Sequence, residues 1–232
     1  MSNIVNDFKL FSRDHGVSTT TMDDYQKHMD GIFMNKGIIE PTIIEERQLN
    51  ATQISVFSRL FMDRILFLGT EVNSDVANII NAQLLYLAST NPDKGISIYI
   101  NSPGGSVTAG LSMYDTMNFI SPDISTTCIG QAASMGAVLL SSGTKGKRMA
   151  LPHSDIMIHQ PLTSTGLVQA SDMEIQWKEM KKCKTTLYNI LSENTGKTFD
   201  EIEAACDRDN WFTASEAVDF GLIDKVIKKN VR

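Results

Sequence analysis

Short apolar segments alternate with helical ones along most of the chain, and this alternation limits the fold more than any other feature of the sequence. The strand-like segments, rich in β-branched and apolar residues, are 64–69, 96–101, 124–130 and 155–161. Helical segments separate them at 74–90, 106–120 and 133–143. Parallel strands need a long crossover between them, which a helix usually supplies. The sequence therefore predicts an α/β fold with parallel strands.

Several of the predicted helices have recognisable ends. Ser74 is placed to cap the helix over 74–90. By spacings of three and four, the apolar face of this helix is expected to consist of Val76, Ile79, Ile80, Leu84 and Leu87. Two capping boxes predict short helices near the C-terminus, and they are formed by Thr198 with Glu201 and by Thr213 with Glu216.

The segment 168–194 predicts a helix that is longer than one core requires. No Gly or Pro interrupts it, and apolar residues recur through it at helical spacing: Met173, Trp177, Met180, Cys183, Leu187 and Ile190. We expect part of this helix to project toward a partner.

Composition and charge exclude several classes of function. The chain has 232 residues, of which 42% are hydrophobic and 21% charged, and its formal charge of −6 leaves no basic surplus for a nucleic-acid partner. No apolar stretch is long enough to span a membrane, and the first residues lack the pattern of a signal peptide. The three dispersed cysteines form neither a disulfide framework nor a metal site. We expect a cytoplasmic protein without a metal.

Polar residues dominate the first part of the chain, and apolar density rises only from Ile43 onward. We therefore predict an N-terminal extension over 1–40 and one domain over 41–232.

The segment GQAASMG (130–136) places Ser134 among very small residues, where a strand gives way to a helix. Small residues permit close helix packing, and that role alone would explain them. A reactive serine hydroxyl would also need such neighbours, because a substrate carbonyl must reach it. The first N–H groups of a helix suit a developing oxyanion, and Met135 supplies the nearest one.

The segment PGG (103–105) offers a second source of N–H groups. Gly104 and Gly105 let bare backbone approach a ligand, although a tight turn would need the same glycines. No Gly-Lys-Ser or Gly-Lys-Thr comes directly after it, so the segment is not a phosphate-binding loop.

A serine nucleophile needs a base and a carboxylate that orients the base. Among the four histidines, His159 ends an apolar strand, where α/β folds present functional side chains, while His153 lies in a turn and the other two lie in the polar extension. Spacing alone does not choose among the downstream carboxylates Asp207, Asp209, Asp219 and Asp224. Asp209 precedes an aromatic pair that could bury it beside His159.

Six longer motifs carry a resemblance that covers residue 43 to the C-terminus. They are YINSPGGSVTAG (99–110), YDTM (114–117), GQAASMGAVLL (130–140), KGKR (145–148), MIHQPL (157–162) and DRDNWFTASEAVDFGLID (207–224). Together they resemble the Clp serine peptidase family, the proteolytic subunits of the ATP-dependent Clp protease. The resemblance implies a crotonase-like fold of repeated β-β-α units, in which the helix near 168–194 forms a handle.

The resemblance also implies a role for each site residue. Ser134 would be the nucleophile, His159 the base and Asp209 the orienting carboxylate. The backbone N–H groups of Gly105 and Met135 would form the oxyanion hole. Asp207 and Arg208 match positions that bridge two rings of subunits through ion pairs.

The family likeness further implies an assembly and a partner. Two stacked rings of seven subunits would enclose a chamber, and a hexameric unfoldase such as ClpX, ClpA or ClpC would thread unfolded proteins into it for quality control and turnover. ATP would be used by that unfoldase, so no cofactor is expected in this chain. The family commonly removes a short propeptide, which predicts cleavage near residues 35–40. The segment TSTGLVQAS (163–171) departs from the Gly-rich run usual in the family, and the extension before residue 41 is longer than usual.

Two other functions share parts of this pattern. An acyl-CoA enzyme of the crotonase type would have the same fold and a similar oxyanion hole, but it would not need Ser134, His159 and Asp209 together. A non-catalytic ring subunit would have no reason to retain all three residues. We therefore predict a serine endopeptidase.

Overall fold

The computed structural model describes residues 42–47, 50–163, 166 and 169–228, and it divides the chain into two units, Met1–Val56 and Phe57–Arg232. In the first unit, β1 (Thr42–Arg47) and β2 (Asn50–Ser55) form an antiparallel pair in which Thr42 lies opposite Ser55. The predicted extension over 1–40 and its cleavage near residues 35–40 lie outside the described residues.

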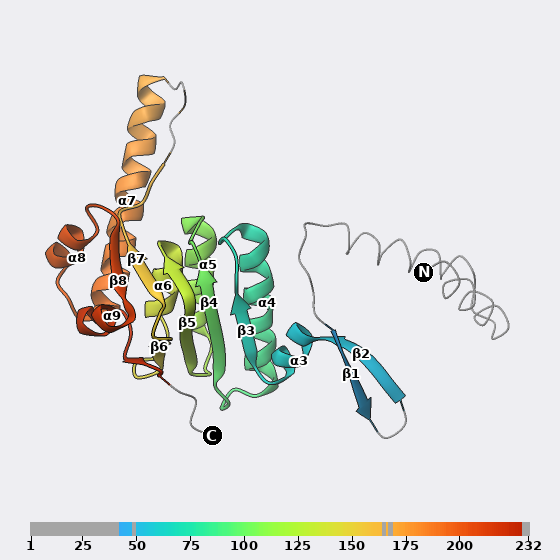
Figure 1. Ribbon diagram of the computed structural model, residues 1–232. Helices are drawn as coiled ribbons and strands as arrows, with labels where there is room; N and C mark the ends of the chain where they lie inside the picture. Colours follow the sequence, from blue (N-terminus) through green and yellow to red (C-terminus); the bar gives the residue numbers. More distant parts are fainter. Residues whose placement is uncertain (1–41, 48–49, 164–165, 167–168, 229–232) are drawn as a thin grey trace, which may run out of the picture. The chain divides into compact units, whose positions relative to one another are not determined.

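The second unit is built around a mainly parallel sheet, as the sequence predicts (Figure 1). Five strands follow one another across it in the order β3 (Ile65–Leu68), β4 (Ile96–Ser102), β5 (Ile124–Ala133), β6 (Arg148–Ala150) and β9 (Lys225–Val226). Strand β7 (Asp155–Ile158) also pairs with β5, and β8 (Asn210–Thr213) pairs antiparallel with β7.

Strand β5 is longer than the predicted segment 124–130 and pairs with two strands along one edge. Its first half, Thr126–Cys128, pairs with β6, and its second half, Gln131–Ala133, pairs with β7. On the other edge the register with β4 shifts between the pairs Ile100–Cys128 and Ser102–Ala132. The strand therefore contains a bulge, which re-aims the residues that follow it.

The helices on the sheet contact one another in chain order. Helix α4 (Ser74–Thr90) contacts α5 (Val107–Phe119), α5 contacts α6 (Met135–Ser141), and α6 contacts α7 (Ala170–Thr195). A short helix, α3 (Val56–Met62), precedes β3, while α8 (Phe199–Ala205) and α9 (Ala214–Phe220) begin at the two predicted capping boxes. Apolar side chains of these strands and helices form one contiguous core.

The start and the face of α4 differ from the prediction. Asn73, not Ser74, is the cap, because its side chain accepts a hydrogen bond from the Val76 N–H. The buried residues of this helix are Ala77, Ile80, Leu84 and Leu87. Ile79 is 57% exposed, so the predicted apolar face is wrong at this position.

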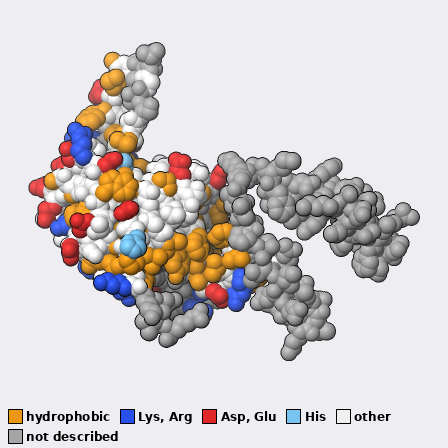
Figure 2. Space-filling view, in the orientation of Figure 1, with side chains coloured by type: hydrophobic (Ala, Val, Ile, Leu, Met, Phe, Trp, Pro, Cys, Tyr) orange, Lys and Arg blue, Asp and Glu red, His pale blue; other side chains and the backbone are white. Residues whose placement is uncertain are grey.

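Helix α7 confirms the predicted long helix, and Figure 1 shows it extending beyond the sheet. Its C-terminal half enters the core through Leu187, Tyr188, Ile190 and Leu191. In its N-terminal half Met173, Ile175 and Trp177 are more than half exposed, and Figure 2 shows apolar side chains along this projecting part.

A buried ion pair ties β6 to the end of the chain. Arg148 Nη2 lies 2.6 Å from Asp224 Oδ1, and the Arg148 side chain is only 4% exposed. Arg148 Nη1 also donates to the carbonyl of Asn194 in α7. Burial acts to raise the pKa of Asp224, but the hydrogen bonds from Arg148 outweigh it and hold that pKa below its usual range.

The Asp224→Asn substitution should lower the free energy of unfolding by about 3 kcal/mol at neutral pH, because it leaves the buried Arg148 without its counter-charge. A carboxylate with a lowered pKa stabilises the fold above its unfolded pKa, and this stabilisation is lost as the pH falls through the folded pKa. The difference between the variant and the wild type should therefore shrink in acid. Urea denaturation measures it. Asp123→Asn is the control, because the Asp123–Lys147 pair is exposed and the denaturation midpoint should hardly move.

Candidate active site

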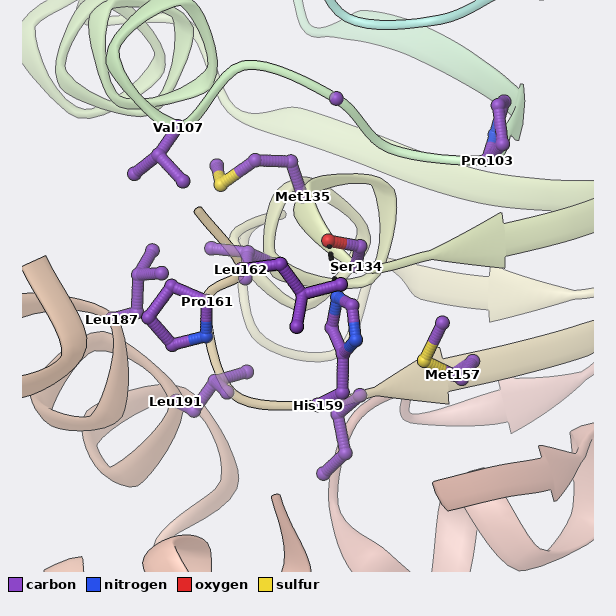
Figure 3. Close-up of a pocket in the computed structure, with 13 residues that line it drawn as sticks. Pro103, Val107, Ser134, Met135, Met157, His159, Pro161, Leu162, Leu187 and Leu191 are labelled. Carbon is purple, nitrogen blue, oxygen red and sulfur yellow. Dashed lines mark hydrogen bonds between the residues drawn. The ribbon is translucent and has the colours of Figure 1, made fainter. Parts of the chain in front are cut away.

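The candidate site lies where three parallel strands end. Ser134 directly follows β5, His159 directly follows β7, and the Gly104–Gly105 segment follows β4. Because parallel strands present their carboxyl ends at one edge of the sheet, these residues meet although they are distant in sequence. Figure 3 shows Ser134 and His159 side by side in a pocket.

Ser134 has a strained backbone. Its φ of 54° and ψ of −122° lie in a region that residues with a side chain rarely adopt. The residue makes a sharp turn between β5 and α6, and its N–H donates to the Met157 carbonyl in β7. A turn of this kind lifts a serine hydroxyl out of the sheet and exposes it to a ligand. The sequence does not signal it, because the GxSxG pattern is missing.

The three side chains form one hydrogen-bonded line. Ser134 Oγ lies 2.9 Å from His159 Nε2, and His159 Nδ1 lies 3.1 Å from Asp209 Oδ1. The His159 side chain is 13% exposed and the Asp209 side chain 65%. If Nδ1 carries the proton toward Asp209, Nε2 is free to accept the proton of the serine hydroxyl. His153 lies in a turn, as predicted, and the structure shows it exposed.

Strand register brings Asp209 to His159. Strands β7 and β8 are antiparallel, and Ile158 lies opposite Asn210. The next residue of one strand and the preceding residue of the other are therefore His159 and Asp209. Asp224 is held by Arg148 instead. The prediction that an aromatic pair buries Asp209 is wrong, because side chains alternate along β8 and Trp211 is 52% exposed while Phe212 points inward.

Gln160 also holds this region together, although sequence reasoning did not single it out. Its N–H donates to the Cys206 carbonyl at 2.7 Å, and its side-chain Nε2 donates to the Asp207 carbonyl at 2.8 Å. The residue after the histidine is thus tied to the segment that carries Asp209. In the sequence, only its position directly after His159 in the MIHQPL motif (157–162) could have pointed to this role.

Gly105 and Met135, the two predicted donors of an oxyanion hole, both have backbone N–H groups near the pocket of Ser134. Helix α6 begins at Met135, so the Met135 N–H belongs to a first turn that lacks intrahelical acceptors. No described residue accepts a hydrogen bond from the Gly105 N–H. Gly105, Ser134 and Met135 all line the same pocket. Donors in this position suit an oxyanion that forms on a substrate carbonyl.

The rest of the pocket is apolar. Figure 3 shows Val107, Pro161, Leu162, Leu187 and Leu191 around the space beside Ser134. Such a lining accepts an uncharged, apolar side chain of a substrate.

The cysteines do not offer a competing nucleophile. Burial raises the pKa of Cys206 to about 12 and also raises the pKa of Cys128 and of Cys183, so all three thiols stay protonated near neutral pH. Within the described part of the chain, no three His, Cys, Asp or Glu residues are grouped to hold a metal ion. No helix in that part has the length and apolarity needed to cross a membrane.

A hydroxyl, an imidazole and a carboxylate joined in a hydrogen-bonded line are characteristic of serine hydrolases. Comparison with known proteins narrows this class. Residues 47–230 match the family model described as Clp protease, and the chain belongs to this family. The chain is therefore a serine peptidase, and the acyl-CoA alternative falls away.

Relatives match over nearly the whole chain. The ATP-dependent Clp protease proteolytic subunit of Porphyromonas gingivalis is 53% identical over 227 residues, which cover 97% of this chain and 99% of the relative. A protein of the same name from Bacteroides fragilis is 57% identical over 200 residues, covering 86% and 96%. Since the first match spans 97% of the chain, it includes most of residues 1–40. A long N-terminal extension therefore also occurs in this relative.

The Asp209→Asn substitution should lower kcat/KM for a short peptide by about 100-fold or more, because an amide can donate to His159 Nδ1 and favour the wrong tautomer. Steady-state kinetics on a fluorogenic peptide measures the loss. Asp219→Asn is the matched control, since Asp219 is exposed on α9 and should be kinetically silent. Equal activity of the two variants would remove Asp209 from the site.

Proposed function

We propose that this chain is the proteolytic subunit of an ATP-dependent Clp protease, in which Ser134, His159 and Asp209 cleave peptide bonds of unfolded proteins. The observation that carries the proposal is the hydrogen-bonded line from Ser134 Oγ through His159 to Asp209. The names of the relatives support the ATP-dependent role.

In the proposed mechanism, Ser134 Oγ attacks the carbonyl carbon of the peptide bond while His159 Nε2 takes its proton. Asp209 accepts the Nδ1–H hydrogen bond and stabilises the resulting imidazolium. The N–H groups of Gly105 and Met135 receive the oxyanion. Each of these proposed steps uses side-chain and backbone groups of the chain itself.

Collapse of the tetrahedral intermediate breaks the C–N bond, and His159 returns its proton to the leaving amine. Ser134 then carries the acyl group. His159 next accepts a proton from water, which attacks the ester; the acyl–Oγ bond then breaks, His159 returns the proton to Ser134 Oγ, and the second product leaves as a carboxylic acid. The apolar lining of the pocket favours substrates with an apolar side chain beside the cleaved bond.

The proposed assembly consists of two stacked rings of seven copies, with an ATPase unfoldase such as ClpX, ClpA or ClpC as the partner. Exposed apolar residues on the projecting half of α7, Met173, Ile175 and Trp177, support it because they need a covering surface. Asp207 and Arg208 suit contacts between rings, since their side chains are 71% and 86% exposed.

The Ser134→Ala variant should lose peptide hydrolysis and labelling by a fluorophosphonate while it keeps its particle size. Alanine fits the same turn, so only the nucleophile is removed. Kinetics, gel-based labelling and size-exclusion chromatography test the three parts. Ser142→Ala, at the other end of α6, is the control and should remain active. Cleavage by Ser134→Ala would overturn the proposed mechanism.

The purified particle should cleave short peptides without nucleotide, whereas a stably folded protein should be degraded only with an unfoldase and ATP. An enclosed chamber admits short or unfolded chains only, and the sequence has no complete phosphate-binding motif: its GKT at 196–198 has Leu191 where that motif needs its first glycine. Degradation of a folded fluorescent protein, followed with and without ATP and partner, measures this. Unaided degradation would contradict an enclosed chamber.

A further inference from the structure

To act as an oxyanion donor, the Gly104–Gly105 segment must hold one N–H group in a fixed direction. Both of its residues are glycines, which have the greatest backbone freedom of all residues. Gly104 has a φ of 92° and Gly105 a φ of 143°, which side chains rarely permit. The freedom that allows these angles also allows the peptide plane between the two residues to rotate. Contacts from outside the segment must therefore fix it.

Both backbone polar groups of Gly104 are held. Its N–H donates to Ser102 Oγ at 3.1 Å, and its carbonyl accepts from the Val72 N–H at 2.7 Å. The Val72 carbonyl in turn accepts from the Ser106 N–H at 2.8 Å, so Val72 and Gly105 form a short parallel bridge. With both ends of Gly104 fixed, its φ and ψ are fixed too.

This arrangement sets the direction of the Gly105 N–H. In a trans peptide the N–H points opposite to the preceding carbonyl, and every described peptide is trans. The Gly104 carbonyl points to Val72. The Gly105 N–H therefore points away from Val72, and Gly105 lines the pocket with Ser134.

The Ser102 hydroxyl has a defined direction as well. Its only proton is donated to the Thr70 carbonyl at 2.6 Å, because a carbonyl cannot donate. Its lone pair therefore faces the Gly104 N–H. Ser102 ends β4, is completely buried, and lies against α6, where a side chain at Gly136 would come within 3.0 Å of the Ser102 carbonyl.

We propose that the buried hydroxyl of Ser102 is a positioning group for the oxyanion hole: it fixes Gly104 and thereby aims the Gly105 N–H at the developing oxyanion. The proposal rests on the proposed function, since it needs Gly105 as a donor in peptide cleavage. Ser102 touches neither the substrate nor the triad. Its effect reaches the reaction only through the direction of one peptide plane.

The test is the Ser102→Ala variant, which leaves the buried Gly104 N–H without its acceptor. Loss of a whole oxyanion donor costs about 100- to 1000-fold in kcat, so a misdirected one should cost about 10- to 100-fold. KM and the inhibition constant of an N-terminal product peptide should change less than about twofold, because neither involves an oxyanion. A peptide boronate forms a tetrahedral adduct on Ser134, and its affinity should fall by about the same factor as kcat.

Ser154→Ala is a closely matched control. Ser154 is 2% exposed, and its hydroxyl likewise donates to a carbonyl, that of Cys128, and accepts from a glycine N–H, that of Gly130. The adjacent Gln131 N–H keeps its own acceptor in Asn101 Oδ1. This variant should lose as much stability as Ser102→Ala and should keep its kcat and boronate affinity.

Any one of the following kinetic results would overturn the proposal: a kcat of Ser102→Ala within about threefold of wild type, an unchanged boronate affinity, or an equal loss of kcat in Ser154→Ala. A Ser102→Ala protein that loses assembly or product binding together with kcat would give Ser102 a structural role only, which also overturns it. Failure of the proposed function is recognised separately, because then Ser134→Ala would still cleave peptide.

Discussion

The pairing of β5 is the interaction on which the rest of the structure depends. This strand pairs with β4 on one edge and with β6 and β7 on the other, so it fixes where three other strands end. The register shift opposite Ser102 lets the strand continue to Ala133 before it turns at Ser134. The strain at Ser134 is tolerated because the buried strands and α6 hold the turn on both sides.

Local pattern was enough to predict the class of fold and most of its elements. These features depend on short-range preferences of the chain. The alternation of strands and helices predicts the α/β class, the two capping boxes predict α8 and α9, and the uninterrupted segment 168–194 predicts α7. The structure confirms each of these predictions. The errors lie where tertiary packing decides. Asn73 competes with Ser74 for one cap, and Ile79 fits the apolar spacing of α4 although the sheet does not cover it.

The sequence predicted only part of the candidate site, again because tertiary structure decides the rest. Ser134 and His159 stand out locally, because each follows an apolar strand and small or apolar neighbours surround it. Asp209 does not stand out, since its contact with His159 depends on the antiparallel register of β7 and β8, which no spacing reveals. The resemblance to the Clp peptidases, not the pattern of residues, selected it. Gln160 and Ser102 act through backbone groups, which leave no chemical signature in a sequence.

The small residues around Ser134 are needed for close packing and also for access to the serine hydroxyl. A side chain at Gly104 would collide with the Ser134 β-carbon, and one at Gly136 would press on the Ser102 carbonyl. Close packing therefore requires these glycines whether or not a substrate is bound. Yet that packing is what holds the glycine segment beside the nucleophile and leaves its hydroxyl open to the pocket. A side chain at Gly104 would also come within 3.0 Å of the Met135 nitrogen, so bulk there would disturb both the packing and the surroundings of the nucleophile.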